Sequence, residues 1–348
     1  MQEGALFDQT PINKGRQLEL DIAKGLAVFF MIAVHVLELL AIPNAADSNI
    51  GMVIEFFGGV PAAPVFMFAM GFGIIYSRNS SPGVLLRRGV QIFFLGYLLN
   101  FLRGWLPFYT KYFITGYEPY FGEAIYEFFY VDILQFAGIA LIFFGVAKKL
   151  DFSIRDLIGC GLIFGLLNIF LVSIKIDDGV AGPIASLFWG ATDTSFFPFL
   201  TWIIYVIAGY VFGYYLIRCN DKSYLYRYCF IISCPFALLL IFMSDLLGDY
   251  NYYQHTLVIT SIFLLFILFW VSLLYFTSSR IPALGVETVK RWSRNVTTIY
   301  FVHWCIIGWL VFFLDYNSQD GLAAFLLVVF ITLASDVIAE GYSRIRKF

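Results

Sequence analysis

Charged side chains are scarce in this sequence. Asp, Glu, Lys and Arg make up 13% of its 348 residues, against about 25% in a soluble domain. Hydrophobic residues reach 60% and aromatic residues 20%. So few charges exclude a soluble domain of this length and a disordered chain. The net charge of −2 offers nucleic acid no general attraction, so we expect no nucleic-acid partner. The composition predicts a polytopic integral membrane protein surrounded by membrane lipids.

Paired cysteines and familiar catalytic motifs are also missing. The five cysteines lie in or beside apolar segments and form no Cys-x-x-Cys pair, which predicts small buried side chains, no disulfide and no metal site. The sequence has no nucleotide-binding glycine loop, zinc cluster or Ser-His-Asp arrangement. The polar stretch before Asp21 leads directly into a long apolar segment, so we expect no cleavable signal peptide.

Ten apolar runs are long enough to cross a bilayer as helices. They predict an all-α fold that forms one transmembrane domain over residues 1–348. Short amphipathic or re-entrant pieces are expected at 108–128 and 180–192, which are aromatic and broken by Gly and Pro. The predicted spans are 22–42, 52–76, 84–106, 130–147, 156–174, 195–217, 228–247, 255–276, 296–314 and 321–340.

The basic residues are unevenly distributed over the predicted loops. Of the 22 Lys and Arg residues, all except Arg103, Lys111 and Lys175 fall in the N-terminal segment, the C-terminal segment or the loops on the same side. Because Lys and Arg accumulate on the cytosolic side, we expect both termini in the cytosol. The sequence shows no strong internal repeat, which weakly disfavours a transporter fold.

The first predicted span carries four ionisable residues, Asp21, Lys24, His35 and Glu38. Lys24 and His35 are separated by about 1100° of helical rotation, which is about 20° beyond three turns, so they share a face. Asp21 and Glu38 lie three residues from Lys24 and His35 and join that face. His35 is about 16 Å beyond Lys24, in the outer part of a hydrocarbon core about 30 Å thick. The spacing predicts that Lys24 and His35 line one passage.

His35 has two interpretations. A neutral imidazole acts as a base or a nucleophile near pH 7, and Glu38 would orient it through a carboxylate–imidazole hydrogen bond. In the alternative, a neighbouring helix satisfies the hydrogen bonds of His35. Lys24 then only extends its charged end to the membrane surface. Because ionisable groups inside a bilayer are costly, the aligned stripe favours a functional site.

Asp21-x-x-Lys24-Gly25, followed by His35, resembles the first helix of the transmembrane acyltransferase superfamily. This superfamily includes bacterial membrane acyltransferases that decorate glycans and the heparan-α-glucosaminide N-acetyltransferases. Lys24 stands where the family usually has Arg, and Met70 replaces a usual Ser. Further segments are similar to family motifs in the expected order: 66–72, 87–89, 132–135, 197–202, 209–213 and 294–303.

The resemblance implies a membrane-bound acyltransferase of the bacterial plasma membrane. Its donor would be cytosolic acyl-CoA, usually acetyl-CoA. Its acceptor would be a sugar hydroxyl or amine on an extracytoplasmic glycan or glycolipid. His35 would be the essential histidine, acting either as a general base or as a transient acyl-His, and the sequence leaves both routes open.

Basic residues are candidates for binding the donor. Arg87 and Arg88 precede the third span and suit bidentate contacts with CoA phosphates. Lys24 has the same candidate role. All three are equally well explained as ordinary positive residues beside membrane spans.

A late motif adds Asn295, Tyr300 and His303 to the candidate donor site. Tyr300 and His303 are three residues apart and share a helix face. His303 would position Asn295, a phosphate or a neighbouring helix. A polar clamp between helices is the alternative to a role in catalysis.

Three residues are candidates for binding the acceptor. Asp132 and Gln135 open the fourth span and either bond the acceptor or cap the helix. His255 starts the eighth span and either orients the acceptor near His35 or belongs to an aromatic belt at the membrane interface.

Other functions stay open at this point. A proton-coupled transporter or flippase would use the same charged stripe as its path. A non-catalytic membrane scaffold is a third class, and a homo-oligomer is compatible with the sequence. The acceptor, the acyl chain length and the choice between O- and N-acylation are not encoded in any motif that we find.

Overall fold

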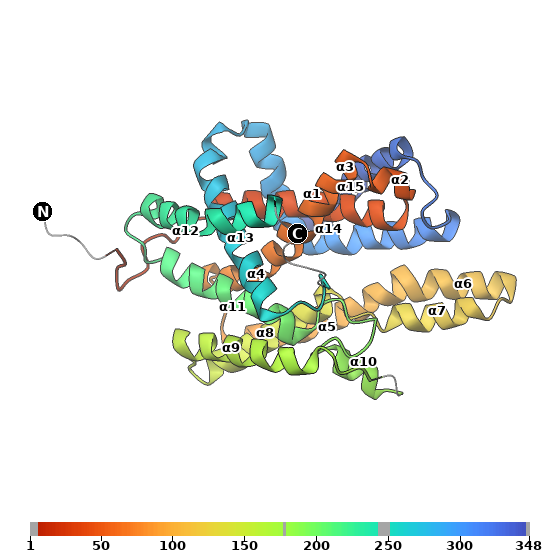
Figure 1. Cartoon of the computed structure of the whole chain (residues 1–348), viewed down its shortest axis with the longest axis horizontal. Helices are drawn as coiled ribbons and strands as arrows, with labels where there is room; N and C mark the ends of the chain where they lie inside the picture. Colours follow the sequence, from red (N-terminus) through yellow and green to blue (C-terminus); the bar gives the residue numbers. More distant parts are fainter. Residues whose placement is uncertain (1–5, 177–178, 243–250, 346–348) are drawn as a thin grey trace, which may run out of the picture. The chain divides into compact units, whose positions relative to one another are not determined.

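The computed structural model describes residues 6–176, 179–242 and 251–345, and helices dominate these stretches (Figure 1). The described residues form no β-strand, only isolated bridges. Nine of their helical stretches are long and apolar enough to cross a membrane, which confirms an all-α, multi-pass membrane protein. These are Leu18–Leu39, Asn49–Tyr76, Pro82–Thr115, Ile154–Leu171, Phe199–Leu216, Lys222–Phe242, Leu257–Arg280, Ala283–Phe313 and Gly321–Ile345.

The predicted span 130–147 corresponds to α8 (Ile133–Lys149), which has 17 residues. At 1.5 Å per residue α8 is about 26 Å long, near the lower limit for crossing the hydrocarbon core. Each of the ten predicted apolar segments therefore contains a helix, and residues 243–247 of the predicted span 228–247 lie outside the described residues. The helix begins in a capping box formed by Asp132 and Gln135, and Lys148 and Lys149 occupy its last turn, where positive charge is favourable.

The described chain divides into two compact units that interleave along the sequence. Unit 1 comprises Met1–Leu20, Pro64–Phe94 and Val131–Arg280. Within it α12 packs against α13, and α11 packs against α9. Its helices are most of α4 (Ala63–Tyr76), the first part of α5 (Pro82–Asn100), α8, α9 (Ile154–Leu171), α10 (Ala181–Ser186), α11 (Phe199–Leu216), α12 (Lys222–Phe242) and α13 (Leu257–Thr277).

Small residues bring α4 and α11 close together inside unit 1. A Cβ atom added at Gly71 would overlap the carbonyl oxygen of Val206, and one added at Gly209 would overlap that of Phe68. Such backbone-to-backbone approach is typical of helix packing in membranes, where small residues replace the hydrophobic effect as the source of tight contact. Trp202, on the same helix as Gly209, is completely buried.

Unit 2 comprises Asp21–Ala63, Leu95–Tyr130 and Ile281–Phe348. Within it α14 packs against α15, and α6 lies side by side with α7 (Figure 1). Its helices are α1 (Leu18–Leu39) from Asp21 onward, α2 (Pro43–Ala46), α3 (Asn49–Phe57), the π-helical η1 (Gly58–Ala62), the last part of α5, the π-helical η2 (Phe101–Trp105), α6 (Leu106–Thr115), α7 (Pro119–Phe128), α14 (Ala283–Phe313) and α15 (Gly321–Ile345).

The third span is longer than predicted. We expected it to end at 106, but α5 continues through the π-helical turn η2 into α6 and ends at Thr115. Pro107 does not break the helix because it occupies the first turn of α6, where the missing N–H costs little. Of the short pieces expected at 108–128, only α7 is separate from this helix.

The ninth span also begins earlier than predicted, at Ala283 instead of 296. Its first turns are polar but supported by ion pairs. Lys290 pairs with Glu287 one turn before it at 3.0 Å, and Arg291 forms two hydrogen bonds, of 2.9 and 2.6 Å, to the Asp336 carboxylate on α15. Asn295, which lies one residue before the predicted span 296–314, is therefore part of this helix.

Candidate functional site

The predicted site residues are divided between the two units. Unit 1 holds Arg87, Arg88, Asp132, Gln135 and His255, whereas unit 2 holds Lys24, His35, Glu38, Asn295, Tyr300 and His303. In unit 2 the structure brings His35, Tyr300 and His303 into contact, and in unit 1 it joins Asp132 to Gln135.

The polar stripe of α1 contacts α14 at Asp21 and again at His35. Asp21 pairs with Lys24 at 3.5 Å, which places both side chains on one face, as the spacing predicted. The Ser293 hydroxyl of α14 donates to the Asp21 carboxylate at 2.6 Å. Asp21 is buried, with 5% of its surface exposed, so this hydrogen bond compensates part of the cost of burying its charge.

Two imidazoles meet fourteen residues further along α1. His35 Nδ1 lies 3.1 Å from His303 Nε2, and the two rings are nearly parallel, with centroids 5.3 Å apart and 9° between their planes. His303 is completely buried, and its Nδ1 lies 3.1 Å from the carbonyl oxygen of Ile299 one turn earlier. The two contacts connect His35, His303 and a backbone carbonyl in one chain.

This chain fixes the protons of both neutral rings. A carbonyl oxygen only accepts hydrogen bonds, so His303 must carry its proton on Nδ1 and donate it to Ile299. His303 Nε2 is then an acceptor, and His35 must donate from its own Nδ1. The remaining nitrogen of His35, Nε2, therefore carries a lone pair and has the form of a base or a nucleophile.

The indole of Trp304 holds the His35 ring from one side, and sequence analysis did not single it out. The centroids of the His35 and Trp304 rings are 4.2 Å apart. The guanidinium of Arg103 lies over the Trp304 ring at 4.2 Å and near the Tyr130 ring at 6.0 Å. Arg103 is 5% exposed. Because a cation over an aromatic face is stabilising, Arg103 helps to fix the indole against His35.

Arg103 lies on the π-helical turn η2, and two glycines allow its close packing. A Cβ at Gly308 of α14 would overlap the Arg103 carbonyl, and a Cβ at Gly104 would overlap the Glu127 side chain of α7. π-helical turns occur frequently at functional sites. The sequence did carry a signal for Arg103, because it is a charged residue at the end of an apolar run, but we assigned it to a loop.

Glu38 and Asn295 do not take the places predicted for them. Glu38 is exposed, and among the described residues no hydrogen bond joins it to His35. The partner of His35 Nδ1 is His303 instead. Asn295 donates from its amide to the Glu340 carboxylate of α15 at 3.4 Å. Tyr300 packs the edge of its ring against His303, with centroids 5.4 Å apart.

In unit 1, Arg87 and Arg88 are exposed on α5, and no described residue forms an ion pair with either of them. Both guanidinium groups therefore fit the predicted phosphate contacts by exposure and charge. Asp132 and Gln135 are both buried. The backbone N–H of Asp132 donates to the side-chain oxygen of Gln135, and the neighbouring N–H of Ile133 donates to the Asp132 carboxylate, which supports helix capping as their role.

His255 lies in a buried aromatic cluster of unit 1, with 2% of its surface exposed. Its Nδ1 lies 2.7 Å from the carbonyl oxygen of Tyr252, and its Nε2 lies 2.8 Å from the hydroxyl of Tyr205. Both ring nitrogens are therefore engaged by the protein. This geometry supports the structural alternative for His255 and leaves neither nitrogen for an acceptor.

A family model described as an acyltransferase domain matches residues 17–340. Because this match covers nearly the whole chain, the chain belongs to that family of membrane acyltransferases, within the transmembrane acyltransferase superfamily. Comparison with curated proteins gives no match. The described residues contain no group of three or more His, Cys, Asp and Glu side chains that would hold a metal ion.

Proposed function

We propose that this membrane acyltransferase moves an acetyl or similar acyl group from cytosolic acyl-CoA to a hydroxyl or amine of an extracytoplasmic glycan or glycolipid. The family membership supports acyl transfer. The resemblance of the individual motifs supports acyl-CoA as donor and a glycan as acceptor. The surplus of Lys and Arg beside alternate spans supports cytosolic termini. The resemblance to bacterial membrane acyltransferases supports a location in a bacterial plasma membrane.

One observation carries the chemical part of the proposal: the chain from the Ile299 carbonyl through His303 to His35. It leaves His35 Nε2 unprotonated without the help of a carboxylate. Trp304 restricts the ring plane, so that nitrogen has a defined direction. A general base or nucleophile needs both properties, the correct protonation state and a fixed orientation.

Two balanced routes use this nitrogen. In the first, His35 Nε2 takes the proton of the acceptor hydroxyl or amine as its oxygen or nitrogen attacks the thioester carbonyl. The C–S bond breaks, and the thiolate of CoA receives the proton. In the second, Nε2 attacks the thioester carbonyl, the C–S bond breaks and CoA leaves as its thiolate. The acceptor oxygen or nitrogen then attacks the acyl-imidazole, the C–N bond breaks, and the acceptor's proton passes to the thiolate, which returns His35 to its neutral form.

His303 is a positioning residue in both routes. When His35 gains a proton or an acyl group on Nε2, its ring becomes positively charged, and the hydrogen bond from Nδ1 to His303 Nε2 becomes stronger. His303 thus stabilises the charged form of His35 as well as its neutral tautomer. For this reason we propose it as a partner of His35 and not as a ligand of the donor.

Acyl-CoA is a substrate in this scheme. Arg87 and Arg88 would hold its phosphates, because their guanidinium groups are exposed and bidentate contacts suit phosphate oxygens. Lys24 shares its charge with Asp21 at 3.5 Å, so its contribution to phosphate binding is expected to be smaller.

The test uses the full chain in lipid nanodiscs with radiolabelled acetyl-CoA and an extract of bacterial surface glycans and glycolipids. We expect release of free CoA and transfer of label that both depend on the acceptor. His35→Ala should abolish transfer while the protein stays monodisperse and still binds CoA, and Phe29→Ala on the same helix should behave as wild type.

Two outcomes would contradict the proposal. Full transfer by His35→Ala would remove His35 from the reaction. Absence of CoA binding, together with uptake of a solute driven by a proton gradient in proteoliposomes, would favour a transporter that uses the same stripe.

A further inference from the structure

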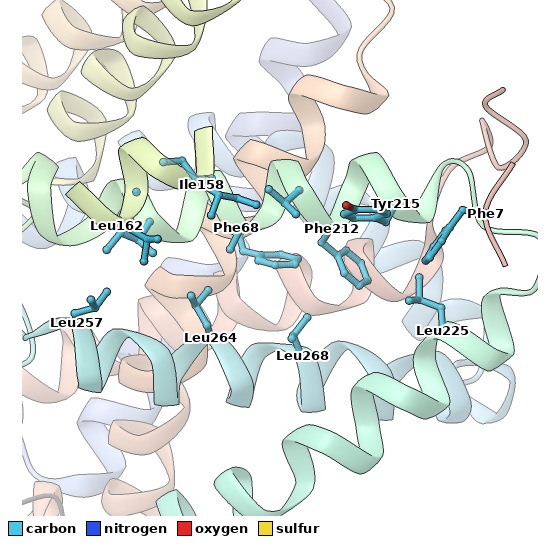
Figure 2. Close-up of a pocket in the computed structure, with 15 residues that line it drawn as sticks. Phe7, Phe68, Ile158, Leu162, Phe212, Tyr215, Leu225, Leu257, Leu264 and Leu268 are labelled. Carbon is cyan, nitrogen blue, oxygen red and sulfur yellow. The ribbon is translucent and has the colours of Figure 1, made fainter. Parts of the chain in front are cut away.

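Unit 1 contains an apolar groove of about 580 Å³ between α9, α11 and α13 (Figure 2). Of the side chains that line it, only Tyr215 carries a polar atom. Phe7 and Leu225 stand at the same end as Tyr215, and Leu257 stands at the other end. A volume of this size is typical of a small-molecule site.

The groove occupies the length of one leaflet. Its α11 wall extends from Ile204 to Tyr215, and the eleven steps between these residues span about 17 Å at 1.5 Å each. Half of a hydrocarbon core about 30 Å thick is about 15 Å. Tyr215 lies next to the last residue of α11, Leu216, so the groove reaches from the membrane interior to one membrane surface.

The groove is open along its side. Ile158 and Leu162 of α9 and Tyr215 of α11 line it and are exposed. Because these helices are long and apolar enough to cross a membrane, an exposed apolar side on them suits lipid better than water. An apolar groove that opens to lipid over the depth of one leaflet fits a hydrocarbon chain in shape and in chemistry.

Two arginines extend the groove beyond its end at the membrane surface. Gly161 of α9 faces Ile207 of α11, and Gly165 faces Ile204, so the two helices run antiparallel along the groove. Arg155 is three residues before Ile158 on α9 and continues the lining face of that helix. Arg218 lies three residues after Tyr215, in the turn that follows the end of α11 at Leu216, so both arginines lie at the same end of the groove.

The guanidinium groups of both arginines remain available to a ligand. Arg155 is exposed. The guanidinium of Arg218 lies 3.8 Å from the centroid of the Tyr214 ring and donates to the Tyr214 carbonyl at 3.0 Å, so only part of its hydrogen-bonding capacity is used. The nearby carboxylates of Asp156 and Asp221 accept hydrogen bonds from backbone N–H groups at helix starts.

We propose that this groove binds one acyl chain of an anionic phospholipid, whose phosphate lies between Arg155 and Arg218. The lipid belongs to the leaflet on the basic side of the protein, where anionic headgroups and positive side chains attract each other. This site is separate from the His35 chain in unit 2 and does not depend on the acyl-transfer reaction.

The N-terminal segment closes the end of the groove and links the lipid to the fold. Phe7 packs its ring against Tyr215, with centroids 5.2 Å apart. The segment is held by backbone hydrogen bonds from Asp8 to Arg218 at 2.8 Å and from Ile12 to Ile217 at 2.7 Å. A bound chain would therefore stabilise the contact between this segment and the end of α11.

Native mass spectrometry of the detergent-purified full chain tests the proposal, with added dioleoyl-phosphatidylglycerol or dioleoyl-phosphatidylcholine as probes. We expect wild type to bind one phosphatidylglycerol tightly and phosphatidylcholine more weakly. Gly161→Phe and Ala208→Phe place a ring in the groove and should weaken phosphatidylglycerol binding at least about tenfold, because several methylene groups lose their site.

Matched variants separate the groove from general lipid contact. Gly159→Phe is on the same helix, at a position with open space around it and outside the groove, and should bind lipid as wild type does. Arg155→Gln with Arg218→Gln should remove the preference for phosphatidylglycerol and retain the groove.

Three results would overturn the proposal. Equal lipid binding by the Gly161→Phe, Ala208→Phe and Gly159→Phe variants would show that the groove is not the site. A lack of preference between the two lipids in wild type would remove the role of the arginines. Displacement of bound phosphatidylglycerol by palmitoyl-CoA would assign the groove to a long-chain acyl donor instead.

Discussion

His35 on α1 of unit 2 and His255 just before α13 of unit 1 both lie in or beside apolar helices, but the protein uses their nitrogens differently. His255 directs Nδ1 to the Tyr252 carbonyl and Nε2 to the Tyr205 hydroxyl, and it is buried. His35 directs Nδ1 to His303 and, among the described residues, forms no hydrogen bond through Nε2.

The difference shows how one residue type serves two purposes. An imidazole whose two nitrogens are both hydrogen-bonded to the protein holds chain segments together. Because each nitrogen has a partner, none is left to react. An imidazole with one nitrogen engaged is oriented but still has a lone pair to offer. His303 resembles His255 in its own contacts, since it donates from Nδ1 to a carbonyl, yet its Nε2 serves another histidine.

The largest expected effect follows from removing the partner of His35. His303→Leu leaves His35 free to adopt the wrong tautomer, and we expect transfer activity to fall about 100-fold or more, since a wrong tautomer costs about 10⁴ in a Ser-His-Asp triad. His303→Gln should recover part of the activity, because its side-chain oxygen accepts from His35. Equal kcat values for the Leu and Gln variants would contradict the positioning role.

The packing around Arg103 gives the next largest effect. A Cβ at Gly308 would overlap the Arg103 carbonyl. We therefore expect Gly308→Ala to lower the free energy of unfolding by about 1–3 kcal/mol, as overpacking does. It should also reduce kcat by moving Trp304 away from His35. In the control Gly285→Ala on α14, the new Cβ meets its nearest neighbour at 3.5 Å, so stability should be unchanged or slightly higher.

His255 offers the opposite test, a change in stability without a change in chemistry. His255→Leu leaves the buried hydroxyl of Tyr205 without this partner, so the free energy of unfolding should fall by about 1–3 kcal/mol. Thermal unfolding of the purified protein measures this loss. The folded fraction should keep its kcat, and Tyr205→Phe added to His255→Leu should recover part of the stability. A lost kcat in fully folded His255→Leu would restore this histidine to the reaction.

The smallest effect concerns the capping box of α8. Asp132→Ala should destabilise the protein by about 1 kcal/mol, the usual cost of a lost N-cap, without changing the KM for the acceptor. Ser153→Ala removes the exposed cap of α9 and should cost less, because water replaces the lost hydrogen bond. A raised KM in the Asp132 variant at unchanged stability would instead support the predicted acceptor contact.

The length of the apolar runs predicted the spans well because a membrane helix must satisfy every backbone group within itself, so a long apolar run has few alternatives. The predicted helix boundaries are wrong at places where side-chain contacts determine where a helix begins or ends. The helix that contains Asn295 starts early because Arg291 pairs with Asp336, a residue far away in the sequence. The third span continues past Arg103 because a π-helical turn precedes Pro107.

The candidate site was predicted in part. Rotation along one helix placed Asp21 on the face of Lys24, and the structure shows the two side chains paired. The same reasoning gave His35 a nearby partner in Glu38, because a single helix offers only its own residues as neighbours. Its described hydrogen-bond partner, His303, and the ring against it, Trp304, come from another helix, and no periodicity relates them to His35.

The sequence by itself determined that this chain is an all-α membrane protein with a stripe of ionisable groups on its first helix, because apolar length and helical rotation are local properties. Only the tertiary structure decided which nitrogen of His35 carries the proton, since that depends on what His303 meets. It also decided that His255 is fully engaged by Tyr205 and Tyr252. Both outcomes depend on distances of about 3 Å between side chains from different segments, which only packing sets.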